Sequence, residues 1–170
     1  MPHTLAQINA YDRQAFVAAL GHLFEHSPWV ADETFAHRPF RDAAHLHAEL
    51  CATLARSSRA LQLELIRAHP DLAGRLAQAG RLTAESSREQ ATAGLDRLAS
   101  EEAEEIKRLN AEYLARFGFP FVICARLNAK DAILRAMRER VTHAPEAEHD
   151  TAIAEIGKIA WLRLLDTLKT

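Results

Sequence analysis

The side chain best suited to proton transfer in this sequence is His69, which interrupts a run of helix-forming residues. An imidazole has an unperturbed pKa of about 6.5, so it can donate a proton near neutral pH. Pro70 follows directly, and proline disfavours the helical conformation in the residue before it while suiting the first turn of a new helix. Asp71 can cap that next helix or orient the imidazole. We therefore predict that His69 is held at a junction between two helices, where it can act as an acid.

Glu89 allows two interpretations. The segment Ser86-Ser87-Arg88-Glu89 matches the S-x-x-E capping box, in which the Glu89 carboxylate accepts a hydrogen bond from the backbone N–H of Ser86. Alternatively, Glu89 belongs to a ligand site, because Gln90 and Thr92 place polar atoms beside it and small residues nearby let another group approach closely. These residues admit a ligand without requiring one, so both interpretations stay open.

Arg163 lies in the middle of a helix face that is otherwise almost entirely apolar. The other members of this face are Ala152, Ile156, Ile159, Ala160 and Thr167. A buried guanidinium needs an anionic or strongly accepting partner, because desolvating an unpaired charge costs several kcal/mol. Arg163 therefore pairs with one of the 23 acidic residues, turns outward to water, or clamps an anionic ligand.

Other reactive residue types give weaker signals. His22 and His26 lie four residues apart and His45 and His47 form a His-x-His pair, but no H-E-x-x-H or Cys/His set completes a metal site. Cys124 lies in an apolar run without an adjacent histidine, which favours a buried, unreactive thiol. The sequence also has no Gly-rich phosphate loop and no Gly-x-Ser-x-Gly motif. We predict no metal site and no nucleophile of these types.

The elements that must position these residues are helices. Apolar spacing and capping signals predict them over about 13–25, 42–54, 59–68, 70–80, 86–98, 100–117, 130–141 and 146–168. A polar link with Pro39 follows the first. The segment 119–125, Phe-Pro-Phe-Val-Ile-Cys-Ala, is short and β-branched, and it has no second comparable run to pair with as a strand. We predict a single all-α domain over residues 1–170, with about seven to nine helices and one buried extended loop.

Composition restricts the classes of partner. A chain of 170 residues can bury a core without disulfides, and its formal charge of −2 gives no electrostatic case for nucleic acid or an anionic membrane. Cys51 and Cys124 are far apart, which fits a reducing compartment. No apolar run approaches the roughly 18 residues of a membrane span, residues 1–11 lack signal-peptide features, and the chain does not end in Ser-Lys-Leu. We expect a cytoplasmic protein that binds neither nucleic acid nor membrane.

Three motifs together resemble one family. They are Ala-His-Pro-Asp-Leu at 68–72, Ser-Ser-Arg-Glu-Gln followed by Ala-Gly-Leu-Asp within 86–96, and Arg-Phe-Gly-Phe-Pro-Phe-Val-Ile at 116–123. The segments 27–30, 38–40 and 155–164 also look like its pattern, so the resemblance covers almost the whole chain. The family is OHCU decarboxylase, the 2-oxo-4-hydroxy-4-carboxy-5-ureidoimidazoline decarboxylases of urate degradation.

The resemblance implies an all-α fold that commonly dimerises, and a reaction without metal or organic cofactor that converts OHCU to (S)-allantoin and CO2. It makes His69 the proton donor and Glu89 its catalytic companion, while Arg163 binds and polarises the ring or ureido oxygens. By the same resemblance, the other residues that line the substrate pocket are Pro70, Ser86, Gln90, Phe121, Val122, Ile123, Cys124 and Ala125. This chain departs from the pattern at none of them.

Two rival functions stay open at this point. A ureide hydrolase acting on allantoate-like substrates would use a similar pocket, although such enzymes usually need a metal. A non-catalytic helical interaction module would instead present an exposed apolar stripe on one helix, which the capped and well-separated predicted helices do not suggest.

Overall fold

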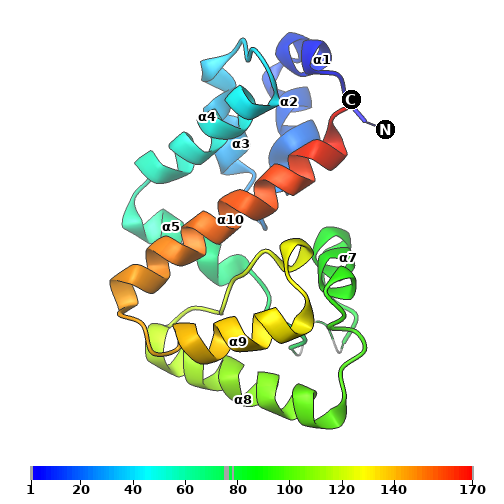
Figure 1. The fold of residues 1–170 in the computed structure, drawn as a ribbon. Helices are drawn as coiled ribbons and strands as arrows, with labels where there is room; N and C mark the ends of the chain where they lie inside the picture. The colour runs from blue at the N-terminus through cyan, green and yellow to red at the C-terminus, as the bar shows by residue number, and fades with distance from the viewer. Residues whose placement is uncertain (1, 75–76, 78, 170) are drawn as a thin grey trace. The chain divides into compact units, whose positions relative to one another are not determined.

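The computed structural model describes residues 2–74, 77 and 79–169, and in this part of the chain the prediction of an all-α fold is confirmed. It contains nine α-helices, three short 3-10 helices and no β-strand (Figure 1). The chain divides into two compact units, one formed by residues 1–68 and 157–170 and the other by residues 69–156. None of the described helices is both long and apolar enough to cross a membrane.

The first unit is built around α3. Its elements are α1 (Leu5–Ala10), α2 (Arg13–Leu20), η1 (Gly21–Leu23), α3 (Trp29–Thr34), η2 (Phe35–His37), α4 (Ala43–Arg56), α5 (Arg59–Ala68) and the part of α10 (Pro145–Thr167) from residue 157. Helix α3 packs on α2 and on α4. The fully buried ring of Phe16 stacks on Phe40 and meets Phe35 edge-on. The two ends of the chain lie side by side, joined by hydrogen bonds of His3 with Thr167 and Lys169 (Figure 1).

The second unit holds the remaining elements. They are α7 (Ala84–Thr92), α8 (Ser100–Phe117), η3 (Ala125–Leu127), α9 (Lys130–Arg140) and the part of α10 up to residue 156. Helices α8 and α9 lie side by side (Figure 1). Two ion pairs join them, between Glu102 and Lys130 at 2.9 Å and between Glu105 and Arg138 at 2.7 Å. Residues 118–129, which connect these two helices, therefore lie within the same unit.

The predicted buried loop is confirmed. All residues from 119 to 125 are buried, and 119–124 form neither helix nor strand. Gly118 ends α8 as predicted, with φ of 74°, a left-handed conformation that glycine adopts without steric cost. The aromatic rings of Phe119 and Phe121 pack edge-on against Tyr113 of α8. The loop therefore has an apolar anchor as well as its backbone contacts.

Several predicted boundaries were wrong. Helix α2 ends at Leu20 rather than at residue 25, because the chain tightens there into η1. The segment after Pro28 is helix α3 and not part of a polar link, since a proline suits the start of a helix as well as the end of one. The short helix α1 was not predicted. Helix α7 runs over 84–92 rather than 86–98, and Gly94, with φ of 81°, follows its end. The expected helix over 70–80 does not begin at Pro70, because residues 70–74 form no helix and Ala73 has a left-handed φ of 49°. Residues 75, 76 and 78 of that expected helix lie outside the described residues.

Candidate active site

His69 occupies the position that its neighbour Pro70 predicts. Helix α5 ends at Ala68, directly before the histidine. The His69 residue is only 8% exposed, while Pro70 is half-buried. The following proline restricts the backbone of His69, and its low exposure shows that the side chain is largely enclosed by the protein.

Two amide side chains hold the segment that follows His69. Asn110 of α8 donates from Nδ2 to the carbonyl oxygen of Leu72 at 2.9 Å. The backbone N–H of Ala73 donates to Oε1 of Gln90, also at 2.9 Å. Ala73 has a φ of 49°, a left-handed conformation that costs a non-glycine residue roughly 1–2 kcal/mol. The hydrogen bond from the Ala73 N–H to Gln90 helps to maintain this turn, and so links helix α7 to the histidine segment.

Helix α7 does not begin as the sequence motif predicts. Its N-cap is Thr83, whose Oγ1 accepts the backbone N–H of Ser86 at 3.2 Å. The capping box predicted at Ser86 is therefore wrong, because Ser86 already lies inside the first turn. Glu89 sits further along the helix and cannot act as its N-terminal capping carboxylate. The structure therefore removes the capping explanation for a glutamate at position 89.

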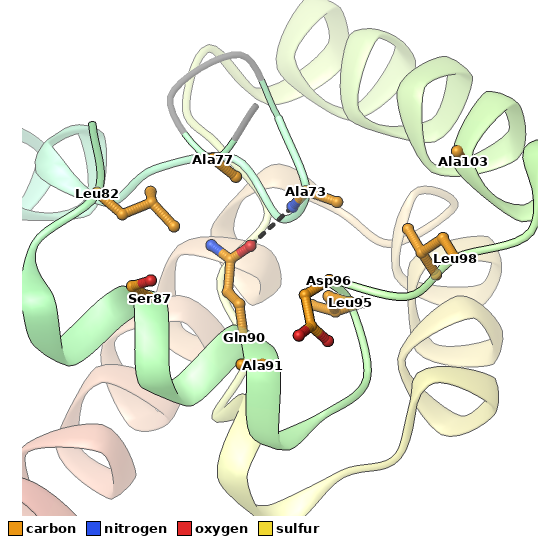
Figure 2. A pocket seen from close by; sticks show the side chains of 10 residues that line it. All are labelled: Ala73, Ala77, Leu82, Ser87, Gln90, Ala91, Leu95, Asp96, Leu98 and Ala103. Atoms are coloured by element: carbon orange, nitrogen blue, oxygen red, sulfur yellow. Dashed lines mark hydrogen bonds between the residues drawn. The ribbon is translucent and has the colours of Figure 1, made fainter. Parts of the chain in front are cut away.

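A pocket of about 370 Å³ opens beside Gln90 in the second unit (Figure 2). Its lining residues are Ala73, Ala77, Leu82, Ser87, Gln90, Ala91, Leu95, Asp96, Leu98 and Ala103. Of the predicted site residues, Gln90 lines this pocket. Ser86 and Gln90 are both buried and lie one helical turn apart, so they share a face of α7.

The buried loop is tied to the same unit through its backbone. The N–H of Cys124 donates to Oε2 of Glu155 at 2.8 Å, and η3, which continues the loop, contacts α7. Burial raises the pKa of the Cys124 thiol, and the carboxylates of Glu155 and Glu89 raise it further. The Glu89 carboxylate is thus close enough to the loop to act on it electrostatically. Glu89 and the loop, which are far apart in sequence, belong to one region of the second unit.

Arg163 lies in the first unit, and it is paired. Its Nη1 is 3.0 Å from Oε2 of Glu25 and 3.3 Å from the carbonyl oxygen of His22. The side chains of Arg163 and Glu25 are 4% and 2% exposed. This geometry matches the interpretation in which Arg163 pairs with an acidic residue.

Some residues that contact the predicted site residues could hardly be identified from the sequence. Asn110, Glu25 and Glu155 each contact a predicted site residue or its segment, and each lies at least 31 residues from its partner along the chain. The one available signal was for Glu155, which falls within the segment 155–164 that resembles the family pattern. In the part of the chain that the structure describes, no three His, Cys, Asp or Glu side chains gather in a way that could hold a metal ion.

Comparisons with known proteins agree with this fold. The family model for OHCU decarboxylase matches residues 9–165. The 2-oxo-4-hydroxy-4-carboxy-5-ureidoimidazoline decarboxylase of Haloferax volcanii is 43% identical over 163 residues, which is 96% of this chain and 95% of the relative. The enzyme of the same description from Amia calva is 42% identical over 97% of this chain and 94% of the relative.

A solved structure is similar over nearly the whole chain. The crystal structure of (S)-allantoin synthase superposes with a TM-score of 0.79 at 31% identity, covering 99% of this chain. This chain spans 55% of the length of that protein. The fold and these similarities define the class of this protein as an all-α decarboxylase. Within that class, the chain belongs to the OHCU decarboxylase family.

Proposed function

We propose that this chain decarboxylates OHCU and delivers a proton to one face of the product, giving (S)-allantoin and CO2 in urate degradation. The observation that carries the proposal is the arrangement in the second unit, where a buried histidine is held at a helix end and a glutamate without a capping role lies near a buried backbone loop. The family membership of the chain supports the same reaction.

The reaction needs few groups from the protein. When the C–CO2 bond breaks, its electron pair moves into the adjacent ring C=N, so the substrate supplies its own electron sink. CO2 leaves, the ring nitrogen of that C=N takes up a proton, and the hydroxyl on the carbon that carried CO2 loses its proton as it becomes a carbonyl. The neighbouring carbon, which bears the ureido group, must then accept a proton. We assign His69 as the donor of that proton, because its position is fixed and an imidazole has a suitable pKa. Delivery from one fixed side chain explains how a single enantiomer is formed.

The remaining predicted residues bind and orient the substrate in this proposal. Glu89 accepts a hydrogen bond from the hydroxyl of the reacting carbon. Gln90 donates through its amide nitrogen, since its oxygen already accepts from Ala73. Ser86 and Pro70 shape the pocket, and backbone groups of 121–125 recognise the ureide edges. The apolar surroundings of this loop also favour loss of a carboxylate as CO2, because they solvate its charge poorly.

Arg163 is assigned to the ring or ureido oxygens of the substrate. A buried guanidinium stabilises negative charge that moves into the ring as CO2 leaves. Glu25 holds this guanidinium in place through its Nη1. In this assignment the pair with Glu25 is the support of a ligand-binding arginine and does not compete with the ligand.

Several further properties belong to the proposal. The chain acts as a single functional domain over residues 1–170, without metal or organic cofactor, as a homodimer in the cytoplasm. Cofactor independence follows from the electron sink in the substrate. Turnover that survives exhaustive treatment with a chelator supports it, and loss of turnover that returns with added metal would favour a ureide hydrolase.

The decisive experiment mixes the protein with freshly generated OHCU and follows the circular dichroism of allantoin. The wild type should form the (S) enantiomer faster than the spontaneous decay. His69→Asn should lose about 10²- to 10⁴-fold in rate, the usual contribution of general acid catalysis, and leave racemic product.

The matched control is His26→Asn. His26 is exposed and has a φ of 47°, a conformation that asparagine tolerates well, so this variant should fold and turn over like the wild type. Near-normal, stereoselective turnover by His69→Asn would eliminate His69 as the proton donor.

A further inference from the structure

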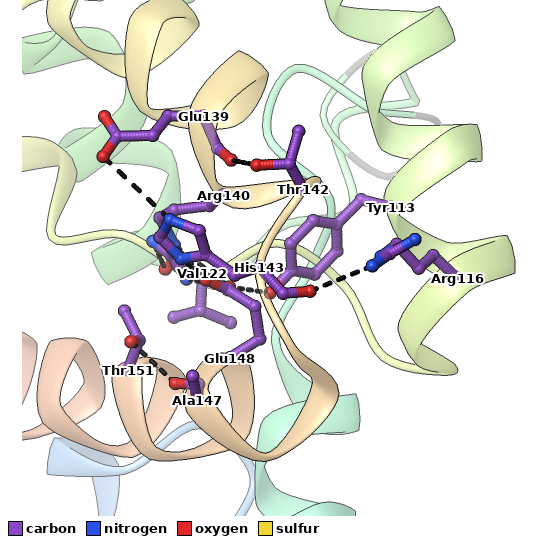
Figure 3. A network of polar contacts seen from close by, with 10 residues as sticks. All are labelled: Tyr113, Arg116, Val122, Glu139, Arg140, Thr142, His143, Ala147, Glu148 and Thr151. Atoms are coloured by element: carbon purple, nitrogen blue, oxygen red, sulfur yellow. Dashed lines mark hydrogen bonds and ion pairs between the residues drawn. The ribbon is translucent and has the colours of Figure 1, made fainter.

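A buried polar cluster joins three helices of the second unit. Glu148 of α10 is completely buried, and Tyr113 of α8 and Arg140 of α9 are 1% and 6% exposed (Figure 3). Arg140 Nη2 lies 3.0 Å from Oε2 of Glu148, and its Nε lies 3.1 Å from the same oxygen. The Tyr113 hydroxyl donates to Glu148, and Nδ1 of the half-exposed His143 lies 2.9 Å from Oε1. We define these four residues as the Arg140–Glu148 cluster.

A buried cluster of charged groups is an unfavourable way to stabilise a fold, because its charges must be desolvated. Removing both charges from water costs several kcal/mol per ion, and well-packed apolar residues of similar volume often stabilise a fold at least as well. Burial of the Tyr113 phenol, together with its hydrogen bond to Glu148, raises its pKa well above the usual range, so the hydroxyl remains a donor. Every acceptor oxygen of Glu148 is satisfied by this arrangement, which fixes the carboxylate and therefore the guanidinium that it holds.

Arg140 makes a second set of contacts, and these are with the buried loop. Its Nη1 donates to the backbone carbonyl oxygen of Val122 at 2.9 Å (Figure 3). Its guanidinium lies 4.3 Å from the centroid of the Phe121 ring. A guanidinium over an aromatic face gains a cation–π interaction, which is stronger where water is excluded. One side chain therefore fixes both the backbone and the ring at the start of residues 121–125.

The other end of this stretch is fixed by a second charged side chain. Two residues beyond Val122, the N–H of Cys124 donates to Oε2 of Glu155 on α10. Asn128 then donates from Nδ2 to the carbonyl oxygen of Cys124 at 3.0 Å. The loop has no strand partner in the described part of the chain, so these side chains take the place that a neighbouring strand would have.

We propose that Arg140, held by Glu148, is a positioning residue for the decarboxylation: it sets the backbone of 121–125 in the geometry that recognises the substrate. The inference rests on the proposed function for its catalytic consequence. Arg140 does not touch the substrate in this proposal. It acts through the Val122 carbonyl and the Phe121 ring, and its charge is compensated by Glu148.

The test is Arg140→Lys. A lysine ammonium can remain with Glu148, but it has no planar fork and cannot also bond the Val122 carbonyl while lying over Phe121. We expect a folded protein whose KM for OHCU rises about 10-fold or more and whose product loses enantiomeric excess, since small misplacements at a site commonly cost 10- to 100-fold. The pH profile of kcat should be unchanged, because the proton donor lies on another segment.

The matched control is Arg138→Lys. Arg138 is on the same helix α9, but its side chain is 55% exposed and makes a two-point pair at 2.7 Å with Glu105 of α8. This variant should keep the KM and the enantiomeric excess of the wild type. Equal losses in the two variants, or a folded Arg140→Lys enzyme with wild-type KM and enantiomeric excess, would overturn the proposal.

A readout that does not depend on activity separates this inference from the proposed function. Amide hydrogen exchange of the peptide covering 119–125 should become faster in Arg140→Lys and not in Arg138→Lys. If the wild type fails to accelerate OHCU decay, the proposed function fails, and the exchange rates still decide whether Arg140 holds the loop. If Arg140→Lys does not fold, Glu148→Gln provides the same comparison, with faster exchange at 119–125 expected and unchanged exchange contradicting the proposal.

Discussion

Glu89 is the residue whose interpretation changes most between sequence and structure. Because Thr83 caps α7, Glu89→Gln leaves the N-cap intact and should lower the free energy of unfolding by less than the roughly 1 kcal/mol that a lost cap costs. Its rate of (S)-allantoin formation should fall about 100-fold or more if Glu89 orients the substrate hydroxyl. Urea denaturation and the circular dichroism assay measure the two effects.

Thr83→Ala gives the opposite pattern and serves as the control. Removing an N-cap threonine typically costs about 1 kcal/mol of stability, and Thr83 is not among the proposed site residues, so turnover should stay within about threefold of the wild type. An active Glu89→Gln enzyme that has lost about 1 kcal/mol of stability would restore the capping interpretation.

At the same scale, His69 and Arg163 show what the sequence can and cannot predict about the site. The position of His69 follows from Pro70, a neighbour whose effect on the backbone is local. The apolar helix face around Arg163 predicts a buried guanidinium but not its partner, since Glu25 is 138 residues away along the chain. Local patterns thus find the candidate side chains, whereas the pairs that hold them form only when the fold is complete.

Among the elements, α8 offers a clean test because its end is defined by one residue. Gly118 has a φ of 74° and donates its N–H to the carbonyl oxygen of Leu114 at 2.8 Å. Gly118→Ala places a Cβ in a left-handed conformation and should lower the free energy of unfolding by about 1–2 kcal/mol. Urea denaturation followed by far-UV circular dichroism measures this change.

A glycine-to-alanine substitution inside helix α10 should instead raise the free energy of unfolding. Gly157 lies within α10, where a new Cβ would meet the Cys51 sulfur at an ordinary contact distance of 3.5 Å. Alanine is favoured over glycine inside a helix by roughly 1 kcal/mol, so Gly157→Ala should stabilise the chain. A Gly118→Ala protein as stable as the wild type would mean that the end of α8 is set by its surroundings rather than by the glycine.

The helices that were predicted well share a physical property. Those over 43–56, 59–68, 100–117, 130–140 and 145–167 each contain at least ten residues and repeat apolar positions over several turns, so their periodicity is unambiguous. The six-residue helices α1 and α3 have too few turns to show a period. For α7, two candidate caps compete three residues apart, and only the hydrogen bond from Ser86 N–H to Thr83 decides between them.

In the whole molecule, the two compact units are formed by different parts of the chain, and each unit contains part of helix α10. Each unit also buries a group that resists ionisation. Burial raises the pKa of the Cys51 thiol in the first unit and of the Cys124 thiol and the Tyr113 phenol in the second. None of these groups changes charge near neutral pH, so stability should not depend on them there.

Above about pH 8.5 these three groups should make the protein less stable. Their pKa is raised in the folded state, so the unfolded chain loses its thiol and phenol protons first, at the ordinary values of about 8.5 and 10, while the folded chain keeps them. Each such group lowers the free energy of unfolding by at most about 1.4 kcal/mol per pH unit. Urea denaturation at pH 7.5, 9.0 and 10.5 should show this loss. Cys51→Ala should reduce its slope by up to one proton, and equal stability at the three pH values would contradict the burial of these groups.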